Sequence, residues 1–492
     1  MSTQGAAAEF AAEIAEASAV SFAEYHFGGA KLGHKARTKA LVRTATQISR
    51  HPGGTLPTKM ANPTSYKSMD ALMNRPEVTH ASVLACHQER TRAKMESSDK
   101  PLLIVHDATH LDYSGLSIKQ LGQVGNAGGR GYICHNSLVV DPSNREALGL
   151  IYQKLHVRRK PPAKEGAKAK REDPNRESRL WSDAVNVLGT LLPGKRWIDV
   201  CDRGADIYEF LATEKKLGRS CVVRACFNRS IVPSHTMPQK ERRPGHRREI
   251  LPQSKLFDYL RTLPAQTDKS KTVVDRKQEK PRKVELSAAW AAVMLLPPHV
   301  TKGIYPNEPI RVWAVRIWEA DPPEGSEPLE WFLLSLEEIS DASKAWEIAS
   351  FYECRFVVEE FHKAQKTGCQ IEDLQFETAQ ALQPMIGILS VIAVLLLNLR
   401  QGARREDADK RKATEIIDRE YEEILRAWRH KQPRGEMTIR EFYMALGRLG
   451  GHMNRRSDGM PGWLTLWRGW MKLELMVAGA AAQRRRQQKI AG

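Results

Sequence analysis

The sequence has few of the features that mark secreted, zinc-binding or repetitive proteins. Its seven cysteines are an odd number, and no two of them form a CxxC pair. That pattern indicates a reducing compartment and argues against a cysteine-based zinc framework. The first residues, MSTQGAAAEFAAEIAEA, include acidic side chains and lack a basic segment before an apolar core, so we expect no signal peptide. No internal repeat is visible.

Long hydrophobic runs are also scarce. The uncharged segment Thr378–Leu399 is the longest, but its strongly apolar part, Met385–Leu397, is shorter than the ~20 residues that a bilayer span needs. Pro384 precedes that part, and a span would leave highly charged chain on both sides. We therefore predict a buried core helix here and no membrane partner.

Acidic residues are outnumbered by basic ones. The 492 residues include 76 Lys and Arg against 58 Asp and Glu, a formal net charge of +18, with 41% hydrophobic and 27% charged residues. This composition is typical of a globular chain, and the length predicts two to four domains. The basic surplus favours a polyanionic partner such as nucleic acid, with an anionic membrane surface as the alternative.

The order of apolar runs predicts a mixed α/β fold. Between residues 100 and 225 the pattern reads three strands, helix, strand, helix, strand, and the five strands are expected at 101–107, 131–141, 147–157, 196–202 and 220–225. A β insertion is expected at about 226–340, with strands at 284–296, 310–320 and 329–336. Helical regions are expected at 1–75, which includes the basic helix 33–51, and at 401–492, so that the α/β domain covers 76–400.

A helix predicted over 343–366 aligns four chemically distinct side chains. At 100° per residue, Tyr352, Arg355, Glu359 and Lys366 fall on one stripe about 60° wide. One interpretation is an intrahelical ion pair between Arg355 and Glu359, which are four residues apart. The other is a site that holds a metal and a phosphate backbone.

Two aspartates support the second interpretation. Asp107 and Asp202 each follow a short apolar strand, where an unpaired carboxylate is unfavourable. Each could instead cap a turn or a helix. Together with Glu359 they would form three oxygen ligands of the kind that Mg²⁺ and Mn²⁺ prefer, and a pair of such ions suits phosphoryl displacement.

These segments resemble a known family. YECRFVVEEFHKAQK is similar to the Y-x2-R-x3-E-x6-K signature of the DDE transposases of insertion-sequence family 4, and IVHDATHLDY and VCDRGADIYEFL are similar to its two aspartate segments. CVVRA and EPLEWFLLS resemble segments that carry a DNA-contacting arginine, here Arg224, and a tryptophan beside a flipped-out base, here Trp331. The chain departs from the family pattern at Gly204, where relatives carry a larger acidic residue, and at Ala108.

The resemblance implies an RNase H-like core, a mixed five-stranded sheet with helices, interrupted by the β insertion. It implies that Asp107, Asp202 and Glu359 hold two Mg²⁺ or Mn²⁺ ions. The implied activity is cut-and-paste transposition: nicking of transposon ends, attack of the 3′-OH through a hairpin intermediate, and strand transfer into target DNA. The implied partners are double-stranded DNA and a second copy of the chain, in the bacterial cytoplasm.

In the same resemblance, three residues of the stripe would grip phosphates around the scissile bond, namely Tyr352, Arg355 and Lys366. Two other functions stay open. A catalytically silent DNA-binding regulator fits the basic charge equally well, and an RNase H-type nuclease fits the sheet and the acids. The four-residue stripe and Trp331 favour the transposase over the nuclease.

Overall fold

A computed structural model describes residues 19–491, except 51–53, 61, 126–127, 160–165, 167–168, 170–171, 235–238, 244–245, 251–252, 275–280, 299–307, 324–327, 405–406, 416, 418, 431–434 and 456–457. The chain divides into two compact units. Unit 1 comprises Met1–Ser98, Ala108–Arg158 and Val357–Gly492, and unit 2 comprises Asp99–Asp107 and Arg159–Phe356. The predicted layout of three domains stays a prediction.

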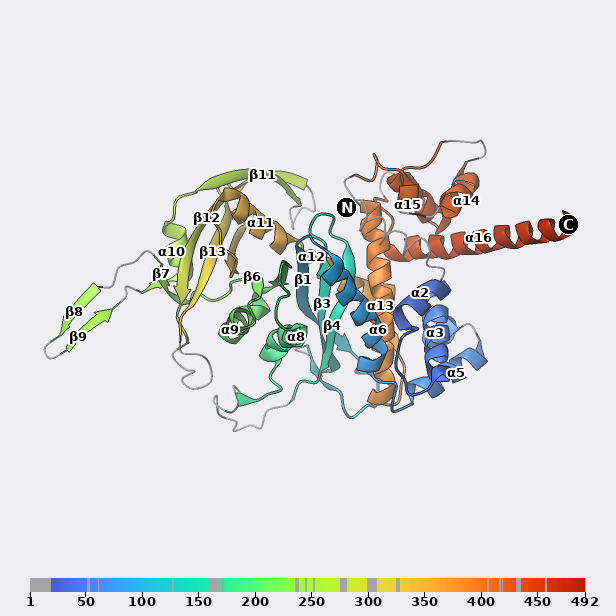
Figure 1. Ribbon diagram of the computed structural model, residues 1–492, viewed down its shortest axis with the longest axis horizontal. Helices are drawn as coiled ribbons and strands as arrows, with labels where there is room; N and C mark the ends of the chain where they lie inside the picture. Colours follow the sequence, from blue (N-terminus) through green and yellow to red (C-terminus); the bar gives the residue numbers. More distant parts are fainter. Residues whose placement is uncertain are drawn as a thin grey trace. The chain divides into compact units, whose positions relative to one another are not determined.

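Unit 2 is built on a mixed β-sheet. Its strands lie in the order β10 (Ser254–Lys255), β7 (Ser230–Pro233), β12 (Pro281–Leu295), β13 (Ile310–Glu319), β14 (Glu330–Ser335), β6 (Ser220–Arg224), β5 (Trp197–Cys201) and β1 (Leu102–Asp112), and β11 (Thr267–Val274) also pairs with β12 (Figure 1). β1, β5 and β6 run parallel, whereas β6, β14, β13 and β12 pair antiparallel. The predicted mixed α/β class is confirmed.

The predicted strands of the insertion are also confirmed, as β12, β13 and β14. They do not form a separate sheet, because β14 pairs with β6 and thereby continues the sheet of β5 and β6. A small hairpin, β8 (Gln239–Arg243) with β9 (His246–Ile250), pairs only with itself among the described strands.

Strand β1 corrects one prediction. The apolar run 102–106 is fully buried, as expected for a parallel strand covered on both faces. The strand does not end at Asp107 but continues to Asp112, so Asp107 lies in mid-strand. The apolar run stops at Asp107 because burial decreases there, while backbone pairing does not need apolar side chains. The strand end at Asp202 is confirmed, since β5 stops at Cys201.

Among the described residues of unit 2, four α-helices accompany this sheet: α8 (Leu180–Leu188), α9 (Tyr208–Lys216), α10 (Leu256–Thr262) and α11 (Ala342–Glu353). α8 and α9 pack against each other, whereas α11 packs on β5, β6 and β12 (Figure 1). α11 begins at Asp341, whose side chain accepts a hydrogen bond from the Lys344 amide as a helix cap.

The predicted uninterrupted helix 343–366 is wrong. α11 ends at Glu353, a turn occupies Cys354 and Arg355, and α12 (Phe356–Lys363) passes into the π-helical turn η4 (Ala364–Gly368). At the interruption the Arg355 amide donates to the Tyr352 carbonyl three residues back, a tighter bond than the α-helical one. A constant 100° per residue therefore does not apply across this segment.

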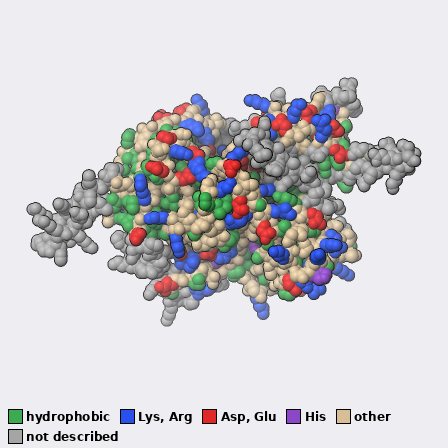
Figure 2. Space-filling view, in the orientation of Figure 1, with side chains coloured by type: hydrophobic (Ala, Val, Ile, Leu, Met, Phe, Trp, Pro, Cys, Tyr) green, Lys and Arg blue, Asp and Glu red, His purple; other side chains and the backbone are tan. Residues whose placement is uncertain are grey.

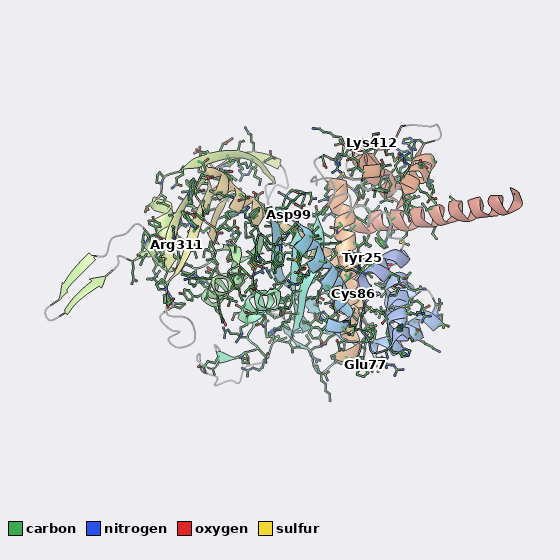
Figure 3. The ribbon with its side chains drawn as sticks, in the orientation of Figure 1. Tyr25, Glu77, Cys86, Asp99, Arg311 and Lys412 are labelled. Atoms are coloured by element: carbon green, nitrogen blue, oxygen red, sulfur yellow. The ribbon has the colours of Figure 1, made fainter. Side chains whose placement is uncertain are left out.

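Unit 1 is mainly helical. Its described elements are α2 (Ala19–Phe27), α3 (Lys35–Arg50), α4 (Leu56–Met60), α5 (Pro63–Met73), α6 (His80–Ser97), β2 (Gly122–Val124), β3 (Gly129–Val140), β4 (Ala147–His156), α12 from Val357 onward, η4, η5 (Ile371–Asp373), α13 (Ala379–Arg404), η6 (Ala413–Glu415), α14 (Arg419–Arg429), α15 (Ile439–Leu449) and α16 (Trp463–Ala491). α2 packs on α6, where the Cys86 thiol lies 3.7 Å from the Tyr25 carbonyl oxygen (Figure 3). The predicted basic helix is confirmed as α3.

Helix α13 forms the core of unit 1. Residues 379–402 are long and apolar enough to cross a membrane by length and composition, but 89% of the most apolar window is buried inside the structure. α13 packs on α6, β4 and α16. Its polar residues are paired in the interior: the Ser390 hydroxyl accepts from Gln153 and Gln365, each at 2.9 Å. The predicted buried core helix is confirmed.

Candidate active site

The sheet of unit 2 places Asp107 beside Asp202. His106 on β1 is opposite Cys201 on β5; Asp107 is the next residue of β1, and Asp202 is the first residue after β5. Neighbouring parallel strands lie about 4.8 Å apart, and opposite residues point to the same face. The register therefore gives the two aspartates neighbouring positions on one face. The side chain of Asp107 is only 15% exposed.

The neighbouring strands β6 and β14 place further predicted site residues next to Asp202 on the same face of the sheet. Cys201 is opposite Val223, which puts Arg224 next to Asp202, and Arg224 is itself opposite Leu333. Trp331 lies two residues from Leu333 and so points to the same face as Arg224. An Arg224 guanidinium nitrogen also donates to the Glu330 carbonyl at 3.5 Å. We call the face that carries these residues the acidic face.

The end of α11 lies on the acidic face. The Tyr352 ring is 2% exposed and packs edge-on against Trp331, with ring centroids 5.5 Å apart. In the turn that follows, Arg355 places a guanidinium nitrogen 3.2 Å from an Asp107 carboxylate oxygen. Unit 2 therefore brings together six of the eight predicted site residues: Asp107, Asp202, Arg224, Trp331, Tyr352 and Arg355.

Asp202 is held by the turn that it starts. Its carboxylate accepts the Gly204 amide at 2.8 Å and caps the short 3₁₀ helix η2 (Arg203–Ala205). A Cβ added to Gly204 would lie 2.7 Å from the Trp181 ring and 3.0 Å from the carboxylate. Trp181 thus fills the space that a side chain at 204 would need, which is a physical reason for glycine at this position.

Asp206 is a residue that the sequence reasoning did not assign. Its carboxylate is fully buried and accepts the backbone amides of Cys226 and Phe227 at 2.8 and 2.9 Å. Its other oxygen accepts from Arg229 at 2.9 Å. Asp206 therefore ties the loop after β5 to the loop after β6. In the sequence, Asp206 could have been found as the second aspartate of the segment D-R-G-A-D.

The other two predicted residues belong to unit 1. Glu359 lies in the first turn of α12 and is half-buried. Lys366 lies in the π-helical turn, and its ammonium group is 3.2 Å from a carboxylate oxygen of Glu372. Glu372 also accepts the Asp112 amide at 2.9 Å, so it links this turn to the end of β1. Sequence reasoning missed Glu372.

Carboxylates at neighbouring positions, as the register gives for Asp107 and Asp202, are the kind of oxygen donor that a hard divalent cation prefers. In the part of the chain that the structure describes, no three Asp, Glu, His or Cys side chains form a group that could hold a metal ion. The implied third ligand, Glu359, lies in unit 1. Unit 2 by itself thus supplies two ligands and a neighbouring arginine.

The opposite face of the sheet carries a buried ionic cluster. Asp199 accepts hydrogen bonds from Arg219 at 2.6 Å and from His106 at 2.7 Å, and the side chains of all three are fully buried. Glu214 is also fully buried, and neither of its carboxylate oxygens has a hydrogen-bond partner. Burial, and secondly the charge of Asp199, raise the pKa of Glu214 well above its usual value.

The surface charge is mixed. Figure 2 shows basic and acidic side chains interspersed on the visible face, so the net charge of +18 is not concentrated there in one patch.

No protein-family model matches this chain.

Proposed function

We propose that this protein is a DDE transposase that cuts and joins DNA with divalent cations, and that its catalytic core is RNase H-like. The observation that carries the proposal is the row of Asp107, Asp202 and Arg224 on adjacent strands, with Trp331 on the same face. Carboxylates can hold the metal ions that cleave a phosphodiester, and an arginine and an aromatic ring can hold the phosphate and an unpaired base beside them.

Asp107, Asp202 and Glu359 would hold Mg²⁺ or Mn²⁺, which when bound would stabilise charge on the attacking and leaving oxygens. The other side chains of the acidic face would position the DNA. Arg355 and Arg224 present charged donors to phosphate oxygens. Trp331, which packs against the buried Tyr352 ring, would offer a ring on which an extruded base can stack.

The ion pair between Arg355 and Asp107 has a clear role in this proposal. It neutralises both groups while DNA and cation are absent. A phosphate would replace the carboxylate on Arg355, and Asp107 would then be released to bind the cation. Lys366 and Glu372 form a corresponding pair in unit 1.

The test incubates the protein and Mg²⁺ with linear DNA that carries the sequences flanking its gene. EDTA in place of Mg²⁺ is the control. The expected products are double-strand breaks with hairpinned ends. Asp202→Ala should lower cleavage roughly a thousandfold, since several kcal/mol of transition-state stabilisation is lost, while DNA binding is retained. DNA that is bound by the wild type but never cut would contradict the proposal.

A DNA-binding regulator without catalysis is the second candidate. It is favoured by the finding that the described residues contain no three-acid group. Under this function Asp202→Ala would change neither DNA binding nor any biological readout, so the same variant separates the two.

A further inference from the structure

The loop that follows β6 presents an aromatic side chain to solvent. Phe227 is 56% exposed, more than any other phenylalanine or tryptophan among the described residues. It comes three residues after Arg224. The Ala225 amide donates to the Phe332 carbonyl at 2.8 Å, which keeps the start of the loop against β14, the strand of Trp331.

This loop is fixed from two sides. The buried carboxylate of Asp206 accepts the Phe227 amide itself at 2.9 Å. On the other side, the Asn228 side chain accepts the Phe257 amide at 2.8 Å, and the Arg229 carbonyl accepts the Leu256 amide at 2.9 Å, so the loop is joined to the start of α10. The exposed ring is thus mounted on a well-bonded backbone.

A cation accompanies the ring. The Arg229 guanidinium lies 5.1 Å from the Phe227 ring centroid, within the range of a cation–π contact, and is itself oriented by Asp206. An aromatic ring next to an arginine is the combination with which proteins bind single-stranded nucleic acid without reading its sequence. A protein partner is less suited, because a stable interface needs about 800 Å² per partner and not a single ring.

We propose that Phe227 is a stacking platform for an unpaired DNA base, in the loop that directly follows Arg224 and separate from Trp331. This proposal rests on the proposed function and extends it: the site would hold a single-stranded segment through two rings, Trp331 and Phe227. The ligand class is single-stranded DNA of any sequence.

The test measures binding of fluorescein-labelled dT20 and of a blunt 20-bp duplex by anisotropy, in EDTA so that no cleavage occurs. Phe227→Ala should weaken dT20 binding about 5- to 160-fold, the range that corresponds to loss of one stacked base, and change duplex binding less than twofold. Phe227→Trp should keep wild-type affinity. Phe227→Leu should bind as weakly as the alanine variant, because it is apolar but cannot stack.

Val187→Ala is the matched control, since Val187 is 63% exposed in α8 of the same unit and should have no effect. Thermal unfolding of each variant checks that the fold is intact. The proposal is overturned if the wild type does not bind dT20, if Phe227→Ala stays within twofold of it, if leucine substitutes fully, or if duplex and single-strand binding fall equally.

Failure of the two proposals can be told apart. If no DNA is ever cut but Phe227→Ala still loses dT20 affinity, the stacking platform stands and the transposase function fails. If cleavage depends on Asp202 while Phe227 has no effect on dT20, the reverse holds.

Discussion

The two faces of the sheet in unit 2 carry aspartates with opposite environments. On one face, Asp199 is fully buried between Arg219 and His106. On the other, Asp107 and Asp202 lie at the boundary of the core, and the Arg355 partner of Asp107 is 12% exposed. Asp199 and Asp202 are three residues apart in one chain segment. Burial and the choice of partner, and not residue type, distinguish a structural acid from one that is available to a ligand.

The two faces also differ in how readily a carboxylate can exchange its ionic partner. A fully buried ion pair stabilises mainly by avoiding an unpaired charge, so neither partner can leave without a large penalty. A pair that is less completely buried loses its partner at a lower penalty, so under the proposed function a cation and a phosphate would replace it.

Asp199→Ala should have the largest effect on stability. It leaves the Arg219 guanidinium buried without its carboxylate, and such a loss costs about 3–5 kcal/mol. Differential scanning calorimetry should show a clear fall in Tm. Asp202→Ala is the control and should change Tm little. Equal effects of the two variants would remove the proposed difference between the faces.

Glu214→Gln should change the pH dependence of stability. A carboxyl whose pKa is raised in the folded state stabilises the fold fully below its unfolded pKa, about 4.5, and this contribution is lost as the pH rises toward the folded pKa. The wild type should therefore lose stability above pH 4.5, by on the order of 1 kcal/mol per pH unit. The glutamine variant should lack this slope.

Urea unfolding at several pH values measures this slope. Glu285→Gln serves as the control, because the Glu285 side chain is 62% exposed and its replacement should leave the slope unchanged. A glutamine variant at 214 that keeps the wild-type slope would show that another group is responsible.

Under the proposed function, Arg355→Ala should change the affinities for DNA and for Mn²⁺ in opposite directions. Loss of charged hydrogen bonds to phosphate, worth about 1.5–3 kcal/mol, should weaken DNA binding on the order of tenfold or more. Release of Asp107 should at the same time strengthen Mn²⁺ binding a few-fold, measured by calorimetry, because the cation no longer competes with the guanidinium. A fall in Tm as large as that of Asp199→Ala would place Arg355 among the structural residues.

Glu372→Gln should have the smallest effect. It frees Lys366, which is 33% exposed, from an ion pair whose value is at most about 1 kcal/mol. DNA affinity should rise two- to threefold and should fall again when Lys366→Ala is added. Reduced affinity of the single variant would mean that Glu372 positions the lysine and does not compete for it.

The sequence predicted most of unit 2. The apolar runs located β5, β6 and the insertion strands, and the strand end at Asp202 was correct. The end of β1 was predicted too early, because the fully buried stretch of the strand stops before Asp107 while its backbone pairing continues to Asp112. The helix break at Cys354 was not foreseen, since no glycine or proline marks it and only backbone hydrogen bonds reveal it.

The sequence predicted the residue types of the site, but not the residues whose hydrogen bonds hold the site in place. Asp206 and Glu372 act through hydrogen bonds to backbone amides and to side chains far away in the chain, and such partners cannot be paired from spacing alone. The joining of β14 to β6, which brings Trp331 near Arg224, likewise depends on long-range strand pairing.

The contact between Gly204 and Trp181 limits the order in which this site can change during evolution. An acidic side chain at 204 would meet the Trp181 ring within 3 Å, so that substitution is unfavourable while the tryptophan is present. Loss of Trp181 alone would leave a cavity beside the turn of Asp202. The two positions are therefore expected to change as a pair, and each constrains which neighbours of the Asp202 turn a descendant of this chain can acquire.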